Sequence, residues 1–168
     1  AVPCQQEKSV FDQVCSNPTG KNGYEEYLRA CDAFLTQVGD EYWNESQKVL
    51  PGDLGWLNAQ RALVTRGSQA IEWVRAGNDK PVSDPRASYD AKTTVPELVH
   101  FKNLSRIFVI KANVQFADGQ PRDAVRTLES GLRFSGNVQG TGILINYLVG
   151  IAMQSIVLKG FSDNLARL

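Results

Sequence analysis

The sequence has few of the residues from which most catalytic and metal sites are built: one histidine, three cysteines and one methionine among 168 residues. Zinc sites draw on cysteine and histidine, and histidine is the most frequent general acid–base group, so both kinds of site are difficult to assemble here. The chain also has no formal net charge, with 18 basic and 18 acidic side chains. Since nucleic-acid-binding proteins normally carry a basic excess, we expect neither a nucleic-acid partner nor a metal or other cofactor.

A long, purely hydrophobic run is also lacking. The most apolar stretch, residues 143–158, includes Asn146, Gln154 and Ser155. A helix that crosses a bilayer needs roughly 20 mostly apolar residues. We therefore predict a core helix in this stretch, and we expect membrane contact only through an anchor that would precede Ala1.

The start of the chain and its cysteines indicate a compartment. The chain begins at Ala1 rather than at methionine, which is typical of a processed protein, so we expect an extracytoplasmic location, either periplasmic or secreted. An oxidising compartment would allow a disulfide between Cys4 and Cys15, although both could equally remain thiols. Cys31 falls on a predicted helix and is expected to be a small buried residue.

Helical periodicity dominates the rest of the sequence, and no segment alternates apolar and polar residues as a half-buried strand does. Apolar residues recur every three or four positions in five segments, 24–38, 53–76, 94–117, 121–136 and 142–159. We predict an all-α fold of about five main helices packed as antiparallel hairpins. A single domain is expected over residues 22–168, preceded by an N-terminal arm over residues 1–21. Residues 78–94 contain two prolines and no period, and are expected to form a long surface loop.

The last helical hairpin carries small residues at regular positions. Between residues 105 and 137 these are Ala112, Ala124 and Gly131. With this pattern the hairpin resembles a tetratricopeptide repeat, whose two helices touch at small residues. Two residues depart from the family pattern: Lys111 stands where leucine is preferred, and Gly136 stands near the usual proline. The resemblance extends to about residue 160, since Gly150 would be the small packing residue of a further helix.

The whole segment 94–160 is also similar to a group of uncharacterised bacterial extracytoplasmic helical proteins, in which a small-residue hairpin is followed by a Leu-x-Gly-Ile-Ala helix (residues 148–152 here). The two resemblances imply a right-handed stack of helical hairpins and a bacterial, secreted or periplasmic location. They imply no reaction.

We therefore expect a non-enzymatic protein–protein interaction or scaffold domain without catalytic residues. A segment of a protein or peptide partner would lie along a hairpin groove. Arg122, Arg126 and Arg133 would supply positive charge, because the first two are four residues apart and share a helix face. These arginines could equally be the polar side of an amphipathic helix. Trp56 and Trp73 are candidate interface anchors, although each could instead be a core residue.

A second hypothesis is a small-molecule-binding protein or enzyme, with a pocket beside the 78–94 loop and His100. His100 is the side chain whose ordinary pKa lies nearest neutrality. A deep pocket beside His100 or a strongly shifted titration would favour this hypothesis, and a shallow groove would favour the scaffold. A third hypothesis is that the chain is the terminal part of a longer repeat array, with an apolar face left exposed. The sequence leaves the partner and the oligomeric state open.

Overall fold

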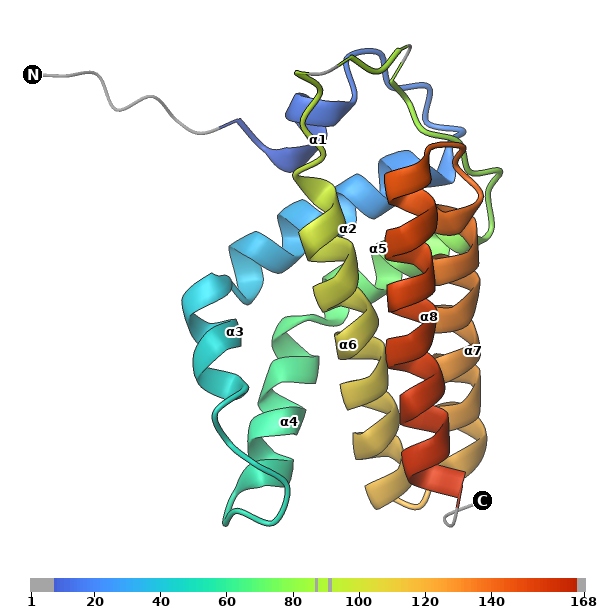
Figure 1. The fold of residues 1–168 in the computed structure, drawn as a ribbon. Helices are drawn as coiled ribbons and strands as arrows, with labels where there is room; N and C mark the ends of the chain where they lie inside the picture. Colours follow the sequence, from blue (N-terminus) through green and yellow to red (C-terminus); the bar gives the residue numbers. More distant parts are fainter. Residues whose placement is uncertain (1–7, 87, 91, 166–168) are drawn as a thin grey trace, which may run out of the picture.

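The computed structural model describes residues 8–86, 88–90 and 92–165, which fold into helices without a strand. The prediction of an all-α fold is confirmed. Five main helices were expected and the described residues form eight, because one predicted helix is divided and two further short helices are present. Figure 1 shows their arrangement. They are α1 (Val10–Val14), α2 (Gly23–Gln37), α3 (Asp40–Ser46), α4 (Trp56–Arg66), α5 (Ser68–Asn78), α6 (Glu97–Ala117), α7 (Pro121–Gln139) and α8 (Leu144–Asn164).

The three longest helices, α6, α7 and α8, lie side by side, with α7 antiparallel to both of its neighbours (Figure 1). Small residues allow this close packing, as the sequence predicts. Ala112 and Ala124 are fully buried. A β-carbon added to Gly131 would lie 3.2 Å from both Phe108 and Val157, so Gly131 sits where α6, α7 and α8 converge. The predicted packing role of small residues in this hairpin is confirmed.

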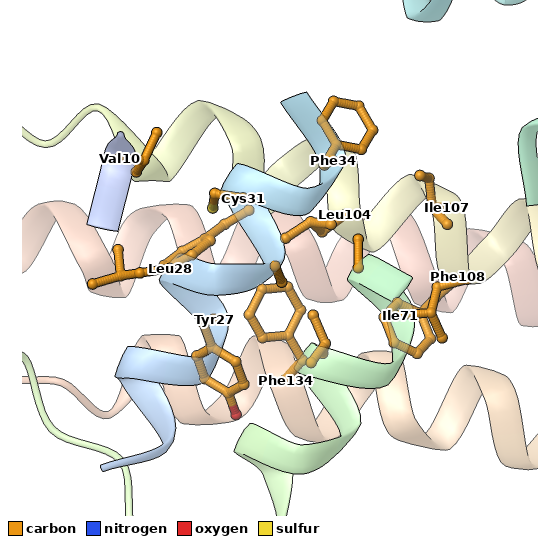
Figure 2. Close-up of a cluster of buried hydrophobic side chains, with 14 of the residues drawn as sticks. Val10, Tyr27, Leu28, Cys31, Phe34, Ile71, Leu104, Ile107, Phe108 and Phe134 are labelled. Carbon is orange, nitrogen blue, oxygen red and sulfur yellow. The ribbon is translucent and has the colours of Figure 1, made fainter. Parts of the chain in front are cut away.

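Helices α2 and α5 pack against each other and cross the α6–α7 hairpin to complete the core. Four aromatic rings meet at this crossing, mostly in edge-to-face contacts: those of Tyr24, Tyr27, Phe101 and Phe134. The ring centroids of Tyr27 and Phe134 are 4.6 Å apart, and those of Phe101 and Phe134 are 5.4 Å apart. Figure 2 shows Tyr27 beside Leu28 and Cys31 on α2, with the Tyr27 hydroxyl directed away from the apolar side chains. Cys31 is fully buried, as expected.

The predicted helix over residues 53–76 is wrong as a single element, since α4 and α5 are separated at Gly67. A β-carbon at Gly67 would lie 3.0 Å from the Ile107 side chain of α6 and 3.3 Å from the Leu63 carbonyl oxygen. The chain therefore bends where it passes closest to α6. This bend allows α4 to lie along α6 while α5 turns to pack against α2.

Part of the expected N-terminal arm belongs to the folded core. Val10 and Val14 of α1 are buried against α2. The Asp32 carboxylate on α2 accepts hydrogen bonds from the backbone N–H groups of Val10 (2.7 Å) and Phe11 (3.1 Å). A carboxylate at free N–H groups of a helix start satisfies donors that have no partner within the helix.

Helix α8 differs from the expected core helix in length and burial. It runs for 21 residues, and by length and composition alone it could cross a membrane. Gly150, Met153 and Val157 are buried against α6 and α7, but Leu148, Ile151 and Leu158 on the other side are exposed. The core assignment therefore holds for one side of α8 only.

Candidate functional site

An open groove of about 670 Å³ lies between the end of α5 and the middle of α7. Three of its lining side chains are arginines, from two helices that lie far apart in the sequence. The lining residues are Arg75, Asn78, Asp79, Arg126, Glu129, Ser130 and Arg133. The groove is open and all its lining residues are polar or charged, whereas sites for small molecules are mostly enclosed and apolar.

A hydrogen-bond network fixes the floor of this groove. The Asn78 amide group on α5 donates to the carbonyl oxygen (3.0 Å) and hydroxyl (3.1 Å) of Ser130 on α7. The buried Tyr27 hydroxyl donates to Asn78 Oδ1 (2.8 Å) and accepts from the Asn137 amide group (2.7 Å). Burial raises the pKa of Tyr27 to about 12, so this hydroxyl stays a neutral donor at physiological pH. The network ties α2, α5 and α7 together directly beneath the arginines.

The arginines above this floor have weak partners. Arg133 lies 3.8 Å from the Asp79 carboxylate and Arg126 lies 3.6 Å from Asp123, both longer than a good charge-assisted hydrogen bond. The Arg126 and Arg133 side chains are 76% and 64% exposed. Exposed ion pairs of this kind contribute ~0–1 kcal/mol. Both guanidinium groups can therefore exchange their present partner for an added carboxylate at little cost.

Two of the three arginines that the sequence singles out lie together in the groove, and the third arginine of the groove is a different residue. Arg126 and Arg133 line the groove, whereas Arg122 is exposed on α7 and is not one of its lining residues. Arg75 on α5 takes part instead, although its guanidinium also pairs with Glu72 at 3.0 Å. Its position could not be foreseen, because the contact between α5 and α7 joins distant parts of the sequence.

A buried charge cluster anchors the connection between α5 and α6, which the sequence presents only as a polar loop. The Arg86 guanidinium donates to both carboxylate oxygens of Glu97, each at 2.8 Å, and to Asp84 at 3.0 Å. The Tyr24 hydroxyl donates to Glu97 at 2.8 Å, and Tyr89 donates to Asp84. The Glu97 side chain is 0% exposed and that of Arg86 is 9% exposed. These groups satisfy one another, so the cluster holds the connection in place.

The ionisation states in this cluster support the same conclusion. Burial would lower the pKa of Arg86, but its hydrogen bonds to Glu97 and the Glu97 charge outweigh burial and raise it. Burial, reinforced by the Glu97 charge, raises the pKa of Tyr24. Burial and the hydrogen bond to Asp84 raise the pKa of Tyr89 to about 12. The arginine therefore stays charged and the tyrosines stay neutral, which is a stabilising arrangement rather than a set of groups poised to exchange protons.

His100 lies at a different groove, of about 450 Å³, which is lined mainly by α1, the two residues before it and α2. Burial lowers the pKa of His100. The groove is open, and Pro96 is its lining residue nearest to the 78–94 loop. That loop lines a separate opening with Gln13, Val14 and Ser16. The geometry thus gives His100 and the loop no shared deep pocket among these openings.

The two candidate tryptophan anchors are both partly buried. Trp73 packs against the main core and stacks under the Arg29 guanidinium, 5.4 Å from the ring centroid. Trp56 begins α4 and lines a shallow opening formed by residues 52–58. Trp43, by contrast, is buried against Phe34, with ring centroids 5.4 Å apart. Neither Trp56 nor Trp73 is a lining residue of the arginine groove.

The cysteines and acidic residues add no further site. Cys15 and Cys31 are both buried and are not bonded to each other, and burial raises the pKa of each thiol. Cys4 lies outside the described residues, so its pairing with Cys15 stays a prediction. Across residues 8–86, 88–90 and 92–165, no three histidine, cysteine or acidic side chains come close enough to hold a metal ion.

Comparison with known proteins adds no relative to this description. No family model matches the chain, and neither a curated protein nor a solved structure is similar enough to count as a match. The residues and their geometry are therefore the whole basis for assigning a function.

Proposed function

We propose that the chain is a non-enzymatic protein-interaction domain of stacked, tetratricopeptide-like helical hairpins, and that the groove between α5 and α7 binds an acidic peptide segment of a partner protein. The observation that carries the proposal is the convergence of Arg75, Arg126 and Arg133 on one groove. An extracytoplasmic location remains part of the proposal, and is supported by the resemblance of residues 94–160 to bacterial extracytoplasmic helical proteins.

Charge and rigidity both favour an acidic peptide. Arginine pairs with carboxylates through two parallel hydrogen bonds, which gives orientation as well as attraction. The lining carries three arginines against two acidic side chains, Asp79 and Glu129, so the groove is positive by one formal charge. Since hydrogen bonds between Tyr27, Asn78 and Ser130 already fix the floor, binding would order only the exposed arginine side chains.

The test uses the full chain and a fluorescein-labelled peptide in which glutamate alternates with serine, with binding measured by fluorescence anisotropy. The double variant Arg126→Glu/Arg133→Glu is expected to weaken binding at least tenfold, because it replaces two attractions by two repulsions. The matched control is Arg122→Glu/Lys48→Glu, which makes the same charge change at exposed residues outside the groove. The control is expected to retain the wild-type affinity.

Two results would overturn the proposal. One is an equal loss of affinity in the groove variant and in the control, which would mean that net charge alone attracts the peptide. The other is the absence of measurable binding to the wild-type chain at low ionic strength. Far-UV circular dichroism of both variants establishes that the helices remain folded.

A further inference from the structure

The exposed side of α8 carries a regular apolar stripe that the proposed groove does not use. We define the outer stripe as the residues at alternating spacings of four and three along this side: Leu144, Leu148, Ile151, Ser155, Leu158, Ser162 and Leu165. All seven are exposed, with Leu144 at 74% and Leu148 at 55%. The covered side of α8 follows the same spacing two residues away, with Asn146, Gly150, Met153, Val157, Gly160 and Asn164.

We propose that the outer stripe of α8 packs against the outer stripe of a second copy of this chain, forming a two-fold symmetric dimer. At about 100° per residue, a shift of two positions places the two stripes on opposite sides of the helix. Helix α8 is therefore apolar on both sides and covered on one. A helix that is apolar all round is normally buried all round, so the outer stripe requires a partner.

The spacing of the outer stripe indicates that the partner is another helix. Apolar residues that alternate at four and three positions repeat every seven residues, which is the period of helices that pack along one another as coiled coils. The stripe keeps this period through three repeats, from Leu144 to Leu165. Ser155 and Ser162 are the two polar members of the stripe, and each has an apolar neighbour before and after it along the stripe.

The charges beside the stripe favour a second copy over a membrane. Lys159, next to the stripe, pairs with Asp163 at 2.8 Å, so the flank of α8 carries no net charge to repel an identical flank. The whole chain is also neutral, which removes the general repulsion between copies. A bilayer is wider than a helix, and it would also have to cover Lys159 and the exposed Arg106 on α6, the helix that packs beside α8. A single helix is narrow enough to cover the stripe and leave these charges in water.

Self-complementarity follows from symmetry. In a two-fold dimer the same patch is used twice, so a stripe of leucine and isoleucine meets an equal stripe in the partner. One pair of 21-residue helices provides an interface at the small end of the known range. We therefore expect an equilibrium between monomer and dimer with a dissociation constant on the order of micromolar.

Sedimentation equilibrium of the full chain from about 1 µM to several hundred micromolar tests the proposal. The wild-type chain is expected to shift from monomer to dimer over this range. Leu148→Glu/Ile151→Glu is expected to stay monomeric throughout. The matched control, Leu50→Glu/Leu54→Glu, makes the same change at two exposed leucines between α3 and α4 and is expected to dimerise like the wild type.

A variant that is expected to strengthen the dimer keeps the test informative if the glutamate variant unfolds. Ser155→Leu fills a polar gap in the outer stripe and is expected to tighten the dimer at least tenfold. Monomeric wild type at every concentration would overturn the proposal, and so would dimerisation of a folded Leu148→Glu/Ile151→Glu variant. Flotation of the wild-type chain on phosphatidylcholine vesicles, lost in that variant, would assign the stripe to a membrane instead.

Discussion

The contact between α7 and α8 allows a quantitative prediction from two glycines with opposite surroundings. A β-carbon added to Gly150 would lie 2.6 Å from the Gln139 β-carbon and 2.8 Å from both the α-carbon and the backbone nitrogen of Gln139. Ordinary carbon contacts are ~3.5–4.0 Å, so the two helices would have to separate by about 1 Å. Two of the three opposing atoms are backbone, which cannot rotate away. Gly136 on α7 has its nearest such neighbour, Gln154 Nε2, at 3.9 Å.

Gly150→Ala is expected to lower the free energy of unfolding by about 1–2 kcal/mol. Overpacking costs about 1–3 kcal/mol, and we expect the upper part of this range, about 2–3 kcal/mol, because the opposing backbone cannot rotate away. The better helix propensity of alanine offsets about 1 kcal/mol of this. Gly136→Ala should gain the same propensity without the clash, and raise the free energy of unfolding by about 0.5–1 kcal/mol. Urea denaturation followed by far-UV circular dichroism measures both. A Gly150→Ala variant at least as stable as the wild type would refute the close approach of α7 and α8.

Two further predictions concern buried ionisable groups. Glu97→Gln removes the charged partner of the buried Arg86 and is expected to lower the free energy of unfolding by about 3–5 kcal/mol. The control Glu72→Gln breaks the exposed pair with Arg75 and should lower it by less than about 1 kcal/mol. Similar urea midpoints for the two variants would contradict the burial of the cluster. Burial lowers the pKa of His100 from 6.5, so the unfolded chain binds its proton more readily and wild-type stability should fall as the pH decreases below about 6.5. His100→Asn should reduce this dependence between about pH 7 and pH 5, and an unchanged slope would show that His100 is not desolvated.

The helices were largely predictable because the buried face of a helix appears in the sequence as a local periodic pattern of apolar residues. Residues that face the core recur every three or four positions, so the periodicity predicted most residues of α2, α6 and α7 to be helical. The division of α4 from α5 does not interrupt this pattern, because the apolar periodicity continues through Gly67. At this division Gly67 leaves room for Ile107 of α6, a contact between residues that are distant in the sequence.

The candidate site was predictable only where its residues share one helix. Arg126 and Arg133 are seven positions apart and lie on one face of α7, so their pairing could be expected. Arg75 joins them through the packing of α5 on α7, which no local pattern shows. The buried pair of Arg86 and Glu97 was missed for a related reason: in sequence, charged residues beside prolines look like exposed loop, and only the tertiary contacts bury them.

The connection between α5 and α6 has a consequence for how the chain can be opened. Three ties hold it at short intervals: Lys80 binds Glu26, Ser83 exchanges hydrogen bonds with Asn22, and Arg86 binds Glu97. A protease must draw a segment of several free residues into its cleft, and ties this closely spaced leave few of them. The shorter connection between α3 and α4, where Leu50 and Leu54 point into solvent, lacks comparable anchoring to the core among its described contacts. Length is therefore a poor guide to accessibility here, because residues 80–86 of the longer connection are better anchored than the shorter connection.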